Sequence, residues 1–162
     1  MLIATIADTH LPRGNRRLSE RCVELLRSAE LILHAGDVST AETLDAMRAL
    51  GPPLHAVQGN VDCARLRDEL PLELRLAVGG VAIGVVHDAG PARGRLARMR
   101  RRFPDADAVV FGHSHIPLHE RADAFQIFNP GSPTERRRSP HHTMGLAHLA
   151  RGVVEFELVT LD

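Results

Sequence analysis

Two histidines separated by one residue follow a short apolar run, in the stretch Val109-Val110-Phe111-Gly112-His113-Ser114-His115. An apolar run of this length predicts a buried strand, and Gly112 allows the chain to turn sharply after it. The two histidines then lie at the carboxyl end of the strand, where open α/β sheets bind their ligands. Because imidazole is a common metal ligand, this stretch predicts a metal site if other ligands join it.

Polar side chains follow other apolar runs in the same way. Residues 2–7, 31–35, 54–58 and 81–86 all predict buried strands. With the opening stretch, the candidate ligands at the strand ends are Asp8, His10, Asp37, Asn60, His87, His113 and His115. If these strands are neighbours, seven nitrogen and oxygen ligands meet at one edge of the sheets.

A mixed set of nitrogen and oxygen ligands suits Mn, Fe, Ni or Zn better than ions that seek thiolates. One ion takes about four to six donors, so seven predict two ions that share a bridge. Asp37 is central in the set, and we expect its carboxylate to be that bridge. Two ions about 3.5–4 Å apart can generate hydroxide near neutral pH and clamp both reacting oxygens of a phosphate.

Each candidate also has an ordinary structural explanation. An aspartate after a glycine is often a helix cap, and a lone histidine at a strand end often forms a surface hydrogen bond. The coincidence of all seven at strand ends favours the metal site. The remaining histidines are expected in the interior or in hydrogen bonds at the surface: His34 in the interior, and His55, His119, His141, His142 and His148 at the surface.

The elements that position these residues form an α/β pattern in a single domain, residues 1–162. Helical periodicity predicts helices over about 17–29, 40–50 and 92–102, and the first half reads βαβαβ, which implies parallel strands. Gly79-Gly80 predicts a hairpin that joins an alternating strand at 72–78 to the strand at 81–86. Further short strands are predicted at 118–121, 125–128, 143–149 and 153–161.

Composition excludes several classes of protein. Twenty arginines and no lysine balance 20 acidic residues, which gives no basic field for nucleic acid or a membrane surface. Aromatic residues make up 3%, with no Trp or Tyr, too few for a base-stacking platform. No apolar run approaches the ~20 residues of a membrane span, and no signal peptide is evident. We therefore expect a cytoplasmic protein.

The order of the polar blocks resembles that of the calcineurin-like metallophosphoesterases. The blocks are Asp8-x-His10, Gly36-Asp37, Gly59-Asn60-x-Asp62, His87 and Gly112-His113-Ser114-His115. The downstream stretch Asn129-Pro130-Gly131-Ser132 is similar to the small bacterial and archaeal phosphodiesterase branch of that superfamily. This resemblance runs from Met1 nearly to the C-terminus.

The resemblance implies a four-layer αββα sandwich with two mixed β-sheets. It also implies a first ion held by Asp8, His10, Asp37 and His115, and a second held by Asp37, Asn60, His87 and His113. Two divalent ions would be the cofactors, with Mn²⁺ expected first and Fe, Ni, Zn, Co or Mg as alternatives. Relatives in this branch often form homodimers or higher oligomers.

The sequence departs from the wider superfamily in two places. Val61 stands where protein-phosphatase relatives have the histidine of Gly-Asn-His-Glu, which argues against a protein phosphatase and leaves the general acid unidentified. His87-Asp88-Ala89 replaces a common His-Gly-His, so substrate access is expected to differ. Asp62 is expected to have a structural role beside the ligands.

These features predict a metal-dependent phosphodiesterase with a small phosphoester substrate. Asp37, Asn60 and His87 act in catalysis through the metals, and Arg13 and Arg16 are candidate phosphate contacts. The same site also suits a phosphomonoesterase, a nucleotidase or a dinucleotide polyphosphate hydrolase. An alternative from another class is a non-catalytic scaffold like the retromer subunit that shares this fold.

Overall fold

The computed structural model of the chain describes residues 1–162, in which helices and strands alternate through the first half. In chain order the elements are β1 (Leu2–Ile6), α1 (Glu20–Ser28), β2 (Leu31–His34), α2 (Ala41–Arg48), β3 (Leu54–Ala56), α3 (Ala64–Glu69), β4 (Glu73–Val78), β5 (Val81–Val86), α4 (Arg95–Arg102), β6 (Ala108–Val110), β7 (Leu118–Ala122), β8 (Phe125–Asn129), β9 (Thr143–Ala150) and β10 (Val153–Thr160). No helix in the structure combines the length and the apolar character needed to cross a membrane.

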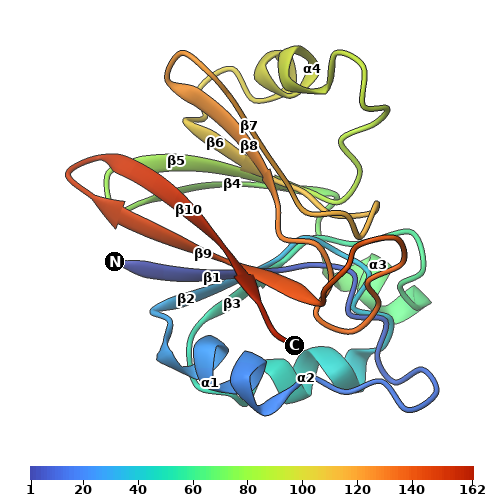
Figure 1. The fold of residues 1–162 in the computed structure, drawn as a ribbon. Helices are drawn as coiled ribbons and strands as arrows, with labels where there is room; N and C mark the ends of the chain where they lie inside the picture. Colours follow the sequence, from blue (N-terminus) through green and yellow to red (C-terminus); the bar gives the residue numbers. More distant parts are fainter.

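The strands form two mixed five-stranded sheets. The first sheet has the order β10-β9-β1-β2-β3, with β1, β2 and β3 parallel. The second has the order β4-β5-β6-β8-β7, with β5, β6 and β8 parallel. The sheets face each other, with α1 and α2 on the outer side of the first sheet and α4 on the outer side of the second (Figure 1). The predicted α/β class and four-layer αββα sandwich are therefore confirmed.

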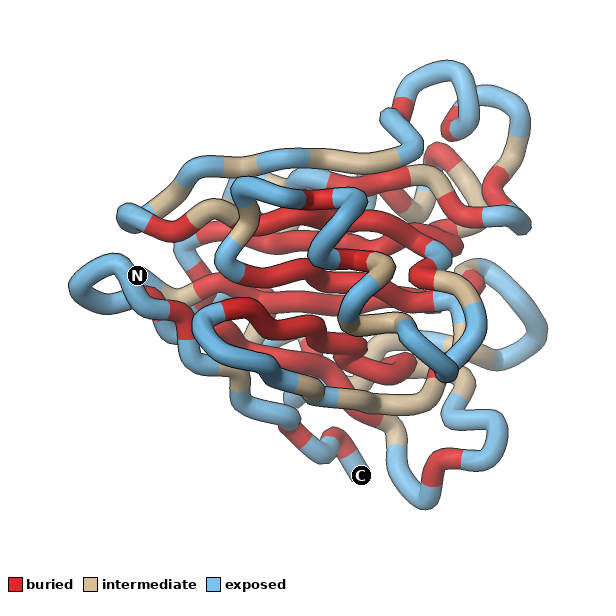
Figure 2. Tube along the Cα trace, turned by 90° about the horizontal axis from the view of Figure 1, so that it is seen from above, coloured by how far each residue is buried: buried red, intermediate tan, exposed pale blue.

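The main core lies between the two sheets. Ile3 and Leu33 of the first sheet belong to the same buried cluster as Ile83, Val85 and Val110 of the second. Because side chains alternate along a strand, the intervening residues form two further clusters against the helices. The central strands accordingly appear buried along most of their length, with exposed turns at both ends (Figure 2).

The N-cap residues set the first residue of each helix. Ser19 accepts a hydrogen bond from the Cys22 backbone N–H, so α1 begins at Glu20 rather than at the predicted residue 17. Cys22, on this helix, is fully buried. The helix predicted from 92 begins at Arg95, after Gly94 in a left-handed conformation. The six-residue helix α3 was not predicted, because a helix this short carries too little periodicity.

His34 is the polar residue buried inside β2, as predicted. Its Nε2 lies 3.1 Å from the Thr9 hydroxyl, and its Nδ1 accepts a hydrogen bond from the Gly36 N–H at 3.2 Å. Burial lowers the pKa of His34 to about 3. The folded protein therefore holds this ring neutral, whereas the unfolded chain protonates it below about pH 6.5. Acid consequently favours the unfolded state through His34.

We expect this linkage to be measurable in metal-free protein. Between pH 6.5 and about pH 3, His34 should lower the free energy of unfolding by about 1.4 kcal/mol per pH unit as the pH falls. Urea unfolding of the wild type and His34→Leu across this range isolates the contribution, because other titrating groups are common to both. The variant should be less stable at pH 7 by about 1–3 kcal/mol through lost hydrogen bonds. The gap should narrow in acid, and a gap independent of pH would contradict this account.

Candidate metal centre

The loops that follow five strands meet at one end of the sandwich. Asp8 and His10 follow β1, Asp37 follows β2, and Asn60 follows β3 in the first sheet. The remaining candidates come from the second sheet: His87 follows β5, and His113 and His115 follow β6. β1 runs away from the end marked N in Figure 1 and delivers its ligands at the opposite edge. The structure thus brings all seven candidate residues together.

One cluster contains four of these side chains, all buried. The Nε2 atoms of His10 and His115 lie 3.1 Å apart. His115 Nε2 lies 3.7 Å from Asp8 Oδ1, and His10 Nε2 lies 3.5 Å from Asp37 Oδ2. These are the four residues implied as ligands of the first ion.

The second cluster lies on the other side of Asp37. His87 Nε2 is 3.3 Å from Asp37 Oδ2 and 3.0 Å from Asn60 Oδ1. His113 Nδ1 is 3.0 Å from Asn60 Oδ1 and 3.3 Å from His87 Nε2. The same carboxylate oxygen of Asp37 therefore faces both clusters, while its Oδ1 accepts a hydrogen bond from the Val61 N–H at 3.0 Å.

Two histidines form hydrogen bonds through Nδ1 to backbone carbonyls outside the clusters, so the lone pair on Nε2 of each ring faces a cluster. His87 Nδ1 donates to the Ala35 carbonyl and His115 Nδ1 donates to the Glu135 carbonyl, both at 2.8 Å. A carbonyl behind the ring fixes the tautomer that leaves Nε2 free to bind a metal. Asp8 Oδ2 is also buried and has no hydrogen-bond partner. Converging acceptors with an orphaned carboxylate oxygen fit divalent cations that take nitrogen and oxygen ligands.

Without a metal ion, the site binds protons instead, because the pKa values of Asp8 and His87 are raised. Burial raises the pKa of Asp8 to about 7. Burial also acts to raise the pKa of Asp37, but the hydrogen bond and charge of His87 outweigh it and lower that pKa to about 2. Burial lowers the pKa of His87, but Asp37 outweighs it and raises that pKa. A divalent ion would replace the proton between His87 and Asp37.

The histidines of the first cluster stay neutral near pH 7. Burial lowers the pKa of His115 to about 4 and also lowers the pKa of His10. Neutral imidazole is the form that binds metals. Both histidines of the first cluster are therefore ready to bind a cation at neutral pH.

Backbone conformation at the site is strained. Five of the seven candidate ligands adopt left-handed φ angles between 47° and 69°, a region costly for residues other than glycine. These five are Asp8, His10, Asp37, His113 and His115. Such strain persists where the surrounding structure fixes the residue, and it concentrates at functional sites.

Glycines leave room for the side chains of the site. A Cβ at Gly59 would collide with Asp37, and one at Gly36 would lie 2.6 Å from His87 Nδ1. A Cβ at Gly112 would lie 3.1 Å from Asp8 Oδ2. The glycines that precede the blocks at Asp37, Asn60 and His113 are therefore required for close packing around the candidate ligands.

Surrounding polar residues support the candidate ligands. Asp62 accepts hydrogen bonds from the backbone N–H groups of Ser39 and Gly59, both at 2.7 Å, which fits its predicted structural role. In the turn Asn129-Pro130-Gly131-Ser132, Asn129 donates to the Gly112 carbonyl at 2.9 Å and Ser132 donates to the Asp8 carbonyl at 2.8 Å. The turn therefore braces the loops after β1 and β6.

One carboxylate was missed by the sequence analysis. Glu135 Oε2 lies 4.0 Å from His10 Nε2 and 3.8 Å from His115 Nδ1, and Glu135 Oε1 forms an ion pair with Arg16 at 3.0 Å. The only signal for it was its position three residues after Ser132. Arg16 thus lies at the site as expected, but bound to Glu135, whereas Arg13 is exposed.

The other histidines named as surface candidates do not belong to either cluster. His119 bonds to Gln126, and His148 to Glu157. His141 and His142 pair with Asp162, while His55 is exposed on β3. These placements agree with the predicted surface and hydrogen-bonded roles.

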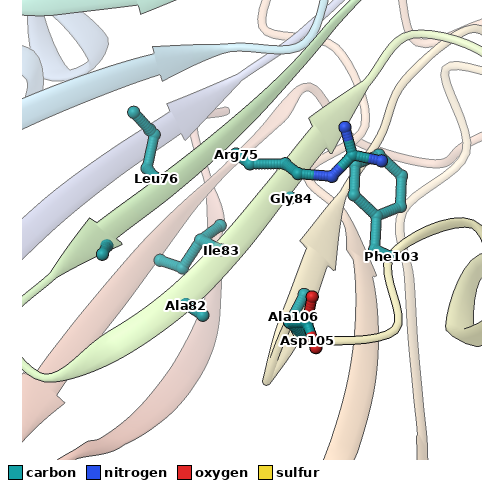
Figure 3. A pocket seen from close by; sticks show the side chains of 9 residues that line it. Arg75, Leu76, Ala82, Ile83, Gly84, Phe103, Asp105 and Ala106 are labelled. Atoms are coloured by element: carbon teal, nitrogen blue, oxygen red, sulfur yellow. The ribbon is translucent and has the colours of Figure 1, made fainter.

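A cleft of about 530 Å³ opens beside the second cluster, and Asn60 and His87 line it. A smaller hollow of about 180 Å³ lies over β4 and β5, where the Arg75 guanidinium covers the Phe103 ring at 4.9 Å (Figure 3). None of the seven candidate ligands lines that hollow. Unlike this hollow, the cleft beside the second cluster therefore exposes candidate ligands to solvent.

Comparison with known proteins assigns the family. The model of the calcineurin-like phosphoesterase superfamily domain matches residues 1–152. A probable metallophosphoesterase from Methanothermobacter thermautotrophicus is 32% identical over 148 residues, which cover 90% of this chain and 85% of that protein.

Solved structures show the same fold. Vps29 from Entamoeba histolytica, complexed with Zn²⁺, has a TM-score of 0.77 at 24% identity and full coverage of both chains. A structure described as a novel archaeal phosphodiesterase has a TM-score of 0.76 at 20% identity and covers 99% of this chain and 100% of its own. With the family match over most of its length, this chain belongs to the calcineurin-like phosphoesterase superfamily.

Proposed function

We propose that this chain is a phosphodiesterase that works with two divalent metal ions. The observation that carries the proposal is the single oxygen of Asp37 that faces two clusters of nitrogen and oxygen acceptors. Asp8, His10 and His115 would hold one ion with Asp37, and Asn60, His87 and His113 would hold the other. When bound, such a pair supplies a hydroxide nucleophile near neutral pH and neutralises charge on the phosphate.

The residues of the chain would position the two ions and determine the side from which the substrate reaches them. Asp37 fixes the spacing of the two halves, and the carbonyls behind His87 and His115 hold the imidazole rings in the orientation for binding. The first cluster is buried, whereas Asn60 and His113 are exposed, so a phosphoester would approach from their side. Mn²⁺ is the ion proposed first, because the mixed donor set suits it.

Val61 bears on the choice of substrate. It follows Asn60, is 44% exposed, and carries no group that can transfer a proton. A leaving group that departs without protonation, such as a phenolate, would then be favoured. This supports activated diesters over alkyl monoesters, for which a nucleotidase or phosphomonoesterase would need a general acid.

The alternative role is a protein-binding scaffold, as suggested by similarity to Vps29. The full set of seven candidate ligands supports catalysis instead, since a scaffold needs none of the strained, glycine-cradled positions. Both roles remain compatible with the same fold, so activity decides between them.

Bis(p-nitrophenyl) phosphate should be hydrolysed with added Mn²⁺, and chelation should abolish the activity. Asn60→Ala should reduce kcat/KM by more than about a hundredfold. Substitution of a residue that only hydrogen-bonds to a metal ligand already lowers metal affinity or activity by about 10–100-fold, and Asn60 is proposed as a ligand itself. Asn15→Ala, in an exposed loop, is the matched control and should retain activity. The proposal fails if Mn²⁺, Ni²⁺ and Co²⁺ all give no turnover and elemental analysis finds no bound metal.

The two histidines after β6 should serve different ions. Each of His113→Ala and His115→Ala should bind one Mn²⁺ per chain instead of two, as measured by equilibrium dialysis and elemental analysis. The double variant His113→Ala/Asn60→Ala should still bind one ion, whereas His113→Ala/His115→Ala should bind none. Identical metal content in these two double variants would contradict the division of ligands.

A further inference from the structure

The cleft beside Asn60 and His87 contains charged and apolar side chains that the metal site does not use. Arg67 of α3 and Arg102 at the end of α4 both line it, together with Leu72 and Asp88. These residues come from separate parts of the chain and meet only in the folded protein. The cleft therefore presents a second set of recognition groups directly beside the candidate ligands.

The two arginines are available to an anion. The Arg67 side chain is exposed, and its guanidinium forms no ion pair or hydrogen bond within the chain. Arg102 uses Nε for an ion pair with Glu73 at 2.8 Å, which holds the side chain in place and leaves its terminal nitrogens unpaired. A guanidinium binds phosphate oxygens through paired N–H groups.

Acidic groups do not cancel this charge. Glu73 also pairs with Arg75 at 2.7 Å, so one carboxylate serves two guanidiniums. Asp88 lines the cleft, but its Oδ1 accepts a hydrogen bond from the Gly90 N–H at 2.7 Å. Of the residues that line the cleft, Arg67 and Arg102 are cationic and Asp88 is the one acidic residue, which leaves one positive charge.

The apolar part of the cleft is exposed to solvent. Leu72 lines the cleft and is 68% exposed, more than any other large hydrophobic side chain of the protein. An exposed apolar surface at the edge of a polar cleft is typical of a ligand-binding site. A planar or apolar group of a substrate could pack against it.

We propose that this cleft binds the part of the substrate beyond the scissile phosphate, and that this part carries an apolar ring and a second phosphate. Arg67 and Arg102 bind the second phosphate, and Leu72 packs against the ring. This is the chemistry of a nucleotide. The inference rests on the proposed phosphodiesterase function and narrows its substrate class.

A matched pair of substrates tests the inference. The p-nitrophenyl ester of thymidine 5′-phosphate is compared with the same ester carrying a second phosphate at the 3′ position. The wild type should show a kcat/KM about tenfold higher for the bisphosphate, as expected for a hydrogen bond to a charged group. Arg67→Gln and Arg102→Gln should each move this ratio toward one. Arg65→Gln on the same helix and Arg101→Gln beside Arg102 are the controls and should keep it.

Binding provides a second readout that needs no turnover. Calorimetry with Mn²⁺-loaded protein should show tighter binding of thymidine 3′,5′-bisphosphate than of thymidine 5′-phosphate, with the difference lost in Arg67→Gln. If neither ester is hydrolysed, hydrolysis of bis(p-nitrophenyl) phosphate still decides the proposed function, and this binding comparison decides the inference alone. Equal affinities in the wild type, or a preference that survives both arginine substitutions, would overturn it.

Discussion

The position of the Asp37 carboxylate is the constraint on which the rest of the site depends. Its Oδ2 lies 3.5 Å from His10 Nε2 and 3.3 Å from His87 Nε2, so one atom faces both halves of the centre. The Val61 N–H holds the other oxygen. Buried acceptors at these distances repel one another unless a proton or a metal ion lies between them. The arrangement is therefore stable only when a proton or a metal ion lies between these acceptors.

Each half of the centre combines residues from both sheets. The first sheet supplies Asp8, His10, Asp37 and Asn60, and the second supplies His87, His113 and His115. The geometry of both clusters is consequently set by how the sheets pack through the core between them. This explains why glycines adjoin the ligands, since a Cβ at Gly36 or Gly59 would press against His87 or Asp37.

The sequence was sufficient to predict the strand ends and the seven residues that meet there. Apolar runs ending in Gly36-Asp37 or Gly59-Asn60 mark both a buried strand and the turn that follows it. The sandwich was implied by the family resemblance that the order of these blocks carries. Helix α3 was missed because six residues with one buried leucine give no periodic pattern.

Residues that act through tertiary position could not be predicted in the same way. Glu135 reaches the site because the turn at Ser132 is bonded to the Asp8 carbonyl. Arg67 and Arg102 are 35 residues apart in the sequence and share a cleft only after both sheets have formed. Within the sequence they read as ordinary surface charges, and only the structure relates them to Asn60.

The most direct test of two ions sharing Asp37 is anomalous diffraction from crystals grown with Mn²⁺. The account predicts two anomalous peaks about 3.5–4 Å apart, both in contact with Asp37 Oδ2, one beside His10 and His115 and the other beside His87 and His113. A single peak, or two peaks of which only one contacts Asp37, would contradict it.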